Sequence, residues 1–252
     1  SKRVMNTIKT EVNQIEVYSI DEAFLDFSDF ADEERASLIK NKVDKWTGIP
    51  ISIGIAKTKT LAKVANHIAK KYKREGVFMF DSEDLIRRAL NVFPVEDLWG
   101  IGRKISKRLK QAGIYTALQF RETDEKWIKR NFSINGVKIQ RELKGEVIYP
   151  LETLRSRKKN ICTSRSFGKE VKELSKLREV VSSHANSCAT KLRDEKSCCL
   201  TISVFLSTNP FNAKVKQYHP YRLFNLDVPT NDSIEIVSYA LKALEHIYRS
   251  DC

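Results

Sequence analysis

The sequence predicts an α+β protein of more than one domain, and three patterns lead to this expectation. Strand-type and helix-type segments alternate over residues 1–93, which indicates a sheet covered by helices. Residues 94–140 are helical with short glycine-containing turns, and residues 160–252 follow a β-α-β-β-α order. A chain of 252 residues is long enough for two to three small domains. We therefore expect domains at 1–93, 94–150 and 160–252, with a basic linker at 151–159.

Apolar spacing and turn residues place the elements of the first domain. Val4, Ile8 and Val12 recur every four residues, as on one face of a short helix. Residues 15–27 are rich in β-branched and aromatic side chains, which is typical of two short strands around a turn. The elements expected next are a helix over 32–46 that Gly48–Pro50 ends, a strand over 51–56, a helix with Leu61, Val64, Ala65 and Ile68 on one face, and a strand over 77–80.

The last domain is expected to have strands near 161–167, 199–206 and 221–226, and helices near 174–193 and 233–248. A fold with this order usually has a final strand that completes its sheet, and the sequence reaches Cys252 without one. The sequence also begins without Met, inside a helical pattern. Both observations lead us to expect a fragment of a longer protein.

Composition restricts the class of protein. Hydrophobic residues make up 41% and charged residues 31% of the chain, as in an ordinary globular protein. No apolar run approaches the roughly 18 residues of a membrane span, and the N-terminus has no signal-peptide pattern. The cysteines form no CxxC pair and are odd in number, which argues against a disulfide framework and against a zinc site. We expect reduced thiols, no membrane contact and a cytoplasmic location.

Charge is distributed unevenly along a chain whose net charge is +13. Residues 1–34 carry a net −6, residues 35–95 and 96–159 carry +8 each, and residues 160–252 carry +3. An acidic cluster in a basic protein is typical of a divalent-metal site beside a phosphate-binding surface. Unevenly charged, solvated faces are the alternative explanation.

The segment Tyr18–Asp26 contains the adjacent carboxylates Asp21 and Glu22. Adjacent residues on a regular strand point to opposite faces, so this pair shares an ion only if it lies at a turn or bulge. Ile20, Ala23 and Phe24 would place the pair at the edge of a core, where a bound Mg²⁺ would relieve the repulsion between the two charges. A solvated Asp-Glu turn in a hairpin is the alternative.

Three lysines surround the start of the helix that follows residue 56. Lysine is disfavoured at a helix N-terminus, whereas the free backbone N–H groups there favour anions. Lys57, Lys59 and Lys63 are therefore consistent with a bound phosphate group, although no GxxxxGK motif is present. Lysines that point into water are the alternative.

A Gly-Ile-Gly turn at 100–102 joins two helical segments and is followed by five basic residues within 103–110. Such a turn leaves backbone N–H groups open to a phosphate, with Lys104 and Lys107 beside them. The pattern is typical of a helix-hairpin-helix, which grips the DNA backbone without reading its sequence. A glycine turn that serves packing alone is the alternative.

Four segments in this order resemble the Y-family translesion DNA polymerases, and most closely their UmuC branch, the ImpB/MucB/SamB type. They are YSIDEAFLD at 18–26, IGIAKTKTLAKVANH at 53–67, PVEDLWGIG at 94–102 and CTSRSFG at 162–168. The resemblance implies that 1–93 is the later part of a palm, 94–150 a helix-hairpin-helix thumb and 160–252 a little finger without its last strand. The first metal-binding Asp of the family, on an N-terminal palm strand, and the fingers after it have no counterpart here.

The resemblance implies templated nucleotidyl transfer with two Mg²⁺ ions, in damage tolerance of the SOS type. The partners it implies are primer–template DNA and deoxynucleoside triphosphates, with a UmuD-type subunit, a recombinase filament and a sliding clamp. It assigns metal binding and catalysis to Asp21 and Glu22, triphosphate contact to Lys59, phosphate contacts in DNA to Gly100, Ile101, Gly102 and Lys104, and template contact to Arg165.

Two alternatives to a polymerase remain at this point. One is a non-catalytic, sequence-independent DNA-binding protein with a degenerate palm, and the other is a helix-hairpin-helix nuclease or glycosylase. Because one metal ligand and the fingers have no counterpart, we expect the 252-residue chain alone to bind DNA and not to extend a primer.

Overall fold

The computed structural model describes residues 1–27, 32–72, 75–153, 157–212 and 216–250. The chain divides into two compact units, Ser1–Arg155 and Ser156–Cys252, and each has a hydrophobic core of its own. The division falls within 151–159, where the sequence predicts a linker. Residues 154–156 of that stretch, like Cys252, lie outside the described residues.

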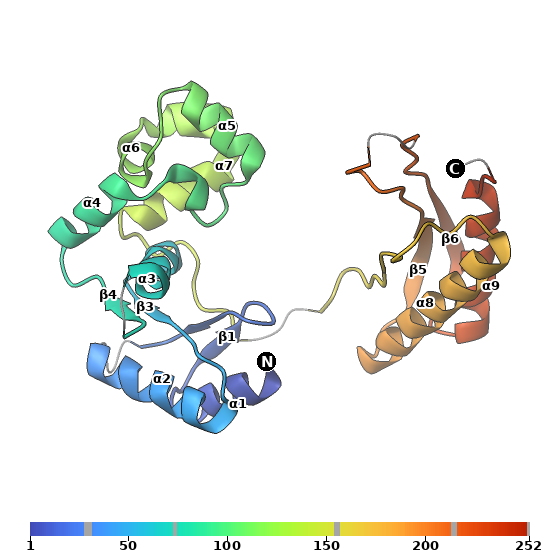
Figure 1. Ribbon diagram of the computed structural model, residues 1–252, viewed down its shortest axis with the longest axis horizontal. Helices are drawn as coiled ribbons and strands as arrows, with labels where there is room; N and C mark the ends of the chain where they lie inside the picture. Colours follow the sequence, from blue (N-terminus) through green and yellow to red (C-terminus); the bar gives the residue numbers. More distant parts are fainter. Residues whose placement is uncertain (28–31, 73–74, 154–156, 213–215, 251–252) are drawn as a thin grey trace. The chain divides into compact units, whose positions relative to one another are not determined.

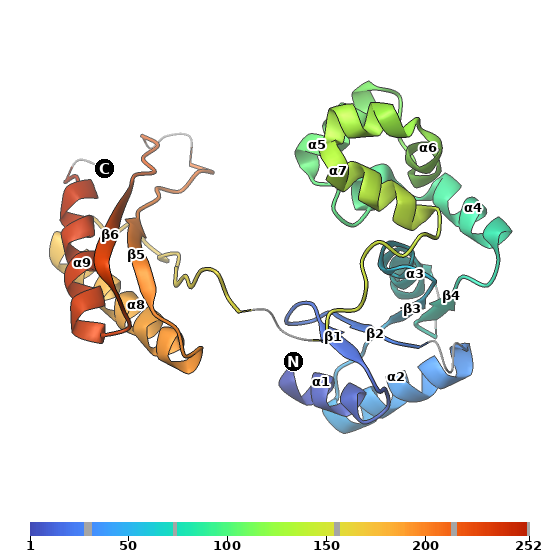
Figure 2. The same ribbon diagram turned by 180° about the vertical axis from the view of Figure 1, so that it is seen from behind.

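Layers of helices and short strands form the first part of unit one. The elements are α1 (Lys2–Lys9), β1 (Ile15–Val17), β2 (Ala23–Leu25), α2 (Glu33–Thr47), β3 (Ile53–Ile55), α3 (Lys59–Tyr72) and β4 (Val77–Met79). β1 pairs antiparallel with β2, and β3 pairs parallel with β4. α1 and α2 lie side by side on one side of the strands, and α3 lies on the other (Figures 1 and 2). The elements expected over 1–80 are all present, with ends that differ by a few residues.

Glycine at position 54 allows α3 to lie directly on β3. A Cβ atom at this position would lie 2.0 Å from the Asn66 nitrogen and 2.5 Å from the Ala62 carbonyl oxygen. Both atoms belong to the helix backbone, which a side chain cannot push aside without moving the helix. The position of α3, and of the lysines at its start, therefore depends on this glycine.

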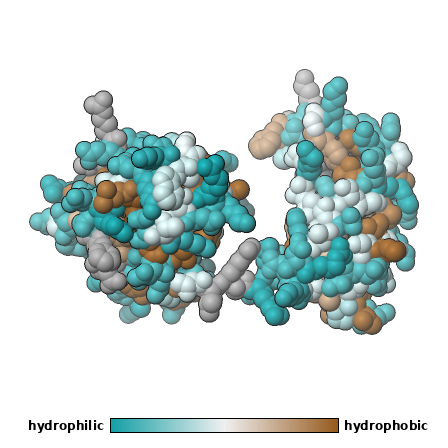
Figure 3. All heavy atoms as spheres, turned by 90° about the horizontal axis from the view of Figure 1, so that it is seen from below, coloured by the Kyte–Doolittle hydropathy of each residue, from teal (hydrophilic) through white to brown (hydrophobic). Residues whose placement is uncertain are grey.

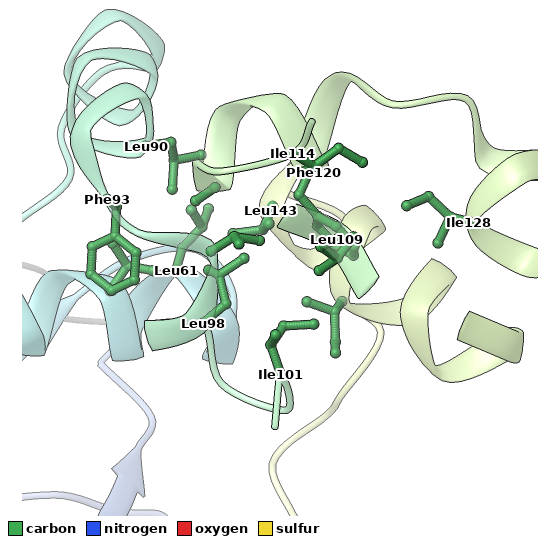
Figure 4. Packing of buried hydrophobic residues seen from close by; sticks show 14 of the residues in the cluster. Leu61, Leu90, Phe93, Leu98, Ile101, Leu109, Ile114, Phe120, Ile128 and Leu143 are labelled. Atoms are coloured by element: carbon green, nitrogen blue, oxygen red, sulfur yellow. The ribbon is translucent and has the colours of Figure 1, made fainter. Parts of the chain in front are cut away.

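Five further helical segments complete unit one and share a core with α3. They are α4 (Glu83–Val92), the 3₁₀ turn η1 (Val95–Asp97), α5 (Arg103–Gln111), α6 (Ala117–Glu122) and α7 (Glu125–Leu143). Figure 4 shows Leu61 of α3 in one cluster with Leu90, Leu109 and Leu143 of α4, α5 and α7. Ser133 interrupts α7 with a φ of 63°.

Helix α4 is absent from the elements expected from sequence. Ser82 caps it by accepting the Leu85 N–H at 3.3 Å, and Glu83 and Asp84 occupy its first turn. A Ser followed by two acidic residues is a recognisable start signal for a helix, so this pattern could have identified it.

Unit two contains α8 (Leu174–Asp194), β5 (Cys199–Phe205), β6 (Tyr221–Thr230) and α9 (Ser233–Ile247). β5 and β6 pair antiparallel, with a register irregularity between Cys199 and Thr201. Ala189 of α8 and Ala240 of α9 pack in one cluster with Ile202 and Leu226 of the strands. Small alanines on both helices allow the two layers to approach closely.

The strand predicted near 161–167 is wrong. The described residues of this segment have no strand assignment, so the described order of unit two is α-β-β-α and not β-α-β-β-α. Ile161 packs against the core, and the Thr163 hydroxyl accepts from the Lys191 ammonium at 3.1 Å and contacts the Cys188 thiol at 3.2 Å. The segment is therefore held by side chains on α8, whereas a strand would need a neighbouring backbone.

The surface is mixed in character. Figure 3 shows that hydrophilic side chains cover most of the face seen there, with hydrophobic side chains exposed in small patches. Within the described ranges, no helix combines the length and apolar content needed to cross a bilayer.

Candidate active site

Asp21 and Glu22 lie in the turn between β1 and β2. The Tyr18 and Ser19 N–H groups both donate to the Glu22 carbonyl at 3.0 Å, which closes the turn. The Asp21 carboxylate is exposed and accepts from the Ser19 hydroxyl at 2.6 Å. The two carboxylates are therefore at a turn, which is the arrangement that sharing one ion requires.

Two ion pairs connect this hairpin to helix α3. Lys59 pairs with Glu16 of β1, and Lys63, one helical turn later, pairs with Glu22. The Lys59 and Glu16 side chains are only 11% and 13% exposed, compared with 24% and 39% for Lys63 and Glu22. Because water screens buried charges less, the Glu16–Lys59 pair is the stronger electrostatic contact.

The sequence patterns did not point to Glu16, yet it lies at the centre of these contacts. Its Oε2 atom accepts from the Lys59 ammonium and also from the Glu152 backbone N–H, at 2.7 Å. The Lys59 ammonium also lies 5.0 Å from the centre of the Phe24 ring. The available signal is an acidic residue between the apolar Ile15 and Val17 of a short strand.

The start of α3 is occupied by a carboxylate of the chain itself. Glu142 of α7 is fully buried, and its Oε2 accepts the Thr60 N–H at 2.9 Å. The Leu61 N–H donates to the Thr58 hydroxyl oxygen at 3.3 Å. The prediction that these N–H groups are free for a phosphate is therefore wrong for Thr60 and Leu61, because Glu142 supplies the anion that the helix dipole favours.

The turn at 98–102 exposes Gly100 and Gly102, but the Ile101 N–H donates to the Leu98 carbonyl at 3.0 Å and is not open as the sequence predicts. Gly100 has a φ of +89°, and a Cβ atom there would lie 2.8 Å from the Ile139 Cδ1 atom. The Ile101 side chain is buried in the core. Lys104 is exposed in the first turn of α5. The residues that line an open depression beside this turn include Gly102, Arg103, Ser106, Lys107 and Lys110.

A cluster of four aromatic rings joins the Asp21–Glu22 turn to the glycine turn. Trp99 meets Tyr18, Phe24 and Tyr149 with ring centres 5.5 to 5.7 Å apart, mostly edge to face. The Trp99 Nε1–H also donates to the Tyr18 hydroxyl at 3.3 Å. Burial, and after it the charge of Glu142, raise the pKa of Tyr149 above its ordinary value. The two candidate turns are thus parts of one packed surface within unit one.

Family models match both ends of this chain. The impB/mucB/samB family model covers residues 1–67, and that of the impB/mucB/samB family C-terminal domain covers residues 158–251. The protein UmuC of Salmonella typhimurium is 41% identical over 260 residues, which include 99% of this chain and 60% of that protein. The chain belongs to the impB/mucB/samB family.

This impB/mucB/samB chain spans about 60% of the length of the curated relatives it matches. Among solved structures, it is similar to a Y-family DNA polymerase chimera of Dbh and Dpo4, with a TM-score of 0.71 at 18% identity over 98% of this chain and 69% of that one. An insertion ternary complex of Dbh DNA polymerase gives 0.56 at 19% identity, with the same coverage. The likeness shows the Y-family polymerase fold, with mixed helices and strands, and confirms the predicted α+β class.

Arg165 of this impB/mucB/samB chain lies in the irregular segment before α8, where its side chain is exposed. It belongs to unit two, whereas the other candidate residues belong to unit one. The cysteines of the described ranges, Cys162, Cys188, Cys198 and Cys199, are free thiols, and burial raises the pKa of Cys199.

The donor set at the hairpin turn suits a hard divalent cation. In the described part of the chain, no group of three or more His, Cys, Asp or Glu side chains could hold a metal ion. Asp21 and Glu22 offer two adjacent carboxylates at an accessible turn. One or two carboxylates fit Mg²⁺, which takes its other ligands from water and substrate phosphates.

Proposed function

We propose that the chain is part of a translesion DNA polymerase that adds nucleotides to a primer 3′ end during tolerance of DNA damage. The observation that carries the proposal is the arrangement around the Asp21–Glu22 turn. Ion pairs join this turn to α3, and an aromatic cluster joins it to the glycine turn at 100–102. Membership of the impB/mucB/samB family supports the same activity.

In this proposal, residues 1–93 form the later part of the palm, 94–150 the thumb, 151–159 a linker and 160–252 the little finger. The core that α3 shares with α4 to α7 supports a palm and thumb packed as one unit. The first candidate for metal binding is the Asp21–Glu22 pair, which would hold Mg²⁺ once Glu22 leaves Lys63. When bound, two Mg²⁺ ions would activate the primer 3′-hydroxyl and neutralise the leaving pyrophosphate.

The remaining roles concern phosphate groups. Lys59 would contact the triphosphate of the incoming nucleotide, where its ammonium offsets the negative charge that develops. The turn formed by Gly100, Ile101 and Gly102, together with Lys104, would hold DNA phosphates through its glycine backbone without reading sequence. Arg165 would contact the template strand from the little finger.

The partners in this proposal are primer–template DNA and deoxynucleoside triphosphates. A UmuD-type subunit, a recombinase filament and a sliding clamp are further proposed partners of the whole protein. The proposal for DNA is supported by the positive charge of residues 35–159, which is the region of α3, the glycine turn and the linker.

The test uses the full-length protein that contains this chain and measures Mg²⁺-dependent extension of a primer past a template lesion. Asp21→Asn and Glu22→Gln should each abolish extension while DNA affinity stays unchanged. Asp44→Asn, at an exposed carboxylate of α2, is the matched control and should retain activity. Full activity in either site variant would identify the pair as a solvated turn. DNA binding without extension by the wild type would favour a non-catalytic DNA-binding protein.

A further inference from the structure

The surroundings of Lys59 restrain its ammonium group from two directions. Only 11% of the side chain is exposed, and the ammonium contacts the Glu16 carboxylate on one side and the Phe24 ring on another. A lysine this far from water needs partners for its charge. Glu16 supplies the opposite charge, and Phe24 adds a cation–π contact.

Glu16 is itself held in place by more than Lys59. Its Oε2 atom accepts the Glu152 N–H at 2.7 Å, so a backbone donor restrains the carboxylate. Glu16 also lies on β1, whose pairing with β2 places Glu16 opposite Phe24. Strand pairing and the backbone hydrogen bond therefore fix the carboxylate independently of the lysine.

The neighbouring pair provides an internal comparison. Lys63 follows Lys59 by one helical turn and pairs with Glu22, but both side chains are more exposed. Glu22 is also the carboxylate that the proposed function assigns to a metal. Glu16, the partner of Lys59, has no other proposed role.

We propose that Glu16 is the positioning residue for Lys59, and this inference rests on the proposed function. An ammonium group has three N–H donors. The bond to Glu16 takes one of them and fixes the direction of the others, which remain available to triphosphate oxygens. The Lys59 side chain then loses little conformational freedom when the nucleotide binds. The Glu16–Lys59 pair stays intact during the reaction.

The experiment measures single-nucleotide incorporation by the full-length protein. Glu16→Gln keeps the shape of the side chain and removes its charge. We expect the KM for the incoming nucleotide to rise on the order of tenfold, with kcat changed less than about twofold, because an oriented ammonium is lost from substrate binding. In a Lys59→Met background the same substitution should change the KM little further, since the partner it positions is gone.

Glu11→Gln is the matched control. Glu11 is 15% exposed and pairs with Lys42, which is 29% exposed, and with Arg35, so its substitution removes the charge of a similarly buried carboxylate in the same unit. It should lower thermal stability without changing the KM. An unchanged KM in Glu16→Gln, or an equal rise in the Lys59→Met background, would overturn the inference.

Two further measurements separate the inference from the proposed function and from simple misfolding. Titration of a non-hydrolysable deoxynucleoside triphosphate with Mg²⁺ should show the same tenfold loss of affinity in Glu16→Gln. If the wild type extends no primer, the proposed function fails. Equal triphosphate affinity in wild type and Glu16→Gln would instead contradict the role of Glu16.

If Glu16→Gln does not fold, Glu16→Asp provides a second variant, which keeps the negative charge on a side chain shorter by one methylene group. It should also raise the KM, and a wild-type KM in a folded Glu16→Asp protein would count against the inference.

Discussion

The carboxylate of Glu142 accepts the backbone N–H of Thr60 at 2.9 Å, across 82 residues of sequence. Its second oxygen accepts the N–H groups of Ile148 and Tyr149 at 2.9 and 3.0 Å. One buried side chain thus joins the end of α7, the start of α3 and the chain that leads out of unit one. A fixed negative charge therefore lies at the start of α3.

Substitution of Glu142 should destabilise unit one. Glu142→Gln removes the charge and leaves an amide nitrogen facing backbone donors, so we expect a loss of about 3 kcal/mol in the free energy of unfolding. Denaturant unfolding of the 252-residue chain measures this loss. Glu146→Gln changes an exposed side chain four residues later and should cost less than about 0.5 kcal/mol. Equal effects of the two substitutions would show that the buried network contributes little.

Gly54→Ala should displace α3 from β3. The new Cβ atom would lie 2.0 Å from the Asn66 nitrogen, and the helix backbone cannot yield locally. We expect a loss of at least about 3 kcal/mol in stability, seen as a lower melting temperature by circular dichroism. Gly168→Ala, with nothing within 4 Å of the added carbon, should melt close to wild type. A wild-type melting curve for Gly54→Ala would contradict this packing.

DNA binding should depend steeply on salt, and Lys104 should account for part of the slope. Lys104 is exposed beside the glycine turn, so Lys104→Ala should reduce the magnitude of the slope of log K against log salt by about 1. Fluorescence anisotropy with labelled primer–template DNA measures this slope. Lys110→Ala is the control, because Lys110 already pairs with Glu96 at 2.7 Å, and it should change the slope less. A flat salt response of the wild type would exclude this surface as the DNA contact.

Alkaline pH should weaken unit one through Tyr149. Burial and the charge of Glu142 raise the pKa of Tyr149 above its ordinary value of 10.0, so the folded protein keeps the phenol protonated where the unfolded chain does not. The contribution to stability is complete below about pH 10 and is lost as the pH rises through the folded-state pKa. Wild type should therefore lose more unfolding free energy than Tyr149→Phe between about pH 9 and pH 11. Tyr115→Phe, at a tyrosine that is 56% exposed, should follow the wild-type pH profile.

Local patterns were sufficient for most of the helices, although α4 was missed. Leu61, Val64 and Ala65 recur at helical spacing and all become buried in the structure. Asp21 and Glu22 stood out as adjacent carboxylates between apolar residues, but the family resemblance, and not this pattern, favoured a metal site over a solvated turn. The assignment of metal binding and catalysis to these two residues remains a prediction.

Local sequence patterns could not predict contacts between residues that are far apart in the sequence. Glu16 and Glu142 meet their partners across 43 and 82 residues, and no spacing rule connects such positions. The segment 161–167 contains residues that suit a strand, but strand formation depends on a neighbouring backbone that the sequence pattern does not specify. Helix formation is local by comparison, so apart from the missed α4 the errors lie in the strand at 161–167 and in long-range contacts.

The interruption of α7 at Ser133 separates the helix into two pieces. Gln140, in the second piece, donates from its Nε2 to the carbonyls of Phe120, Arg121 and Thr123, and Glu142 is anchored at α3. Those contacts, together with the ion pair between Arg141 and Glu125 of the first piece, fix which way residues 134–143 face. A one-residue insertion within 125–132 would turn Ile128 out of the core and break the Glu125–Arg141 ion pair, while Glu142 would keep its own anchor at the start of α3. The first half of α7 is thus set by core packing, whereas the second half is locked to the site.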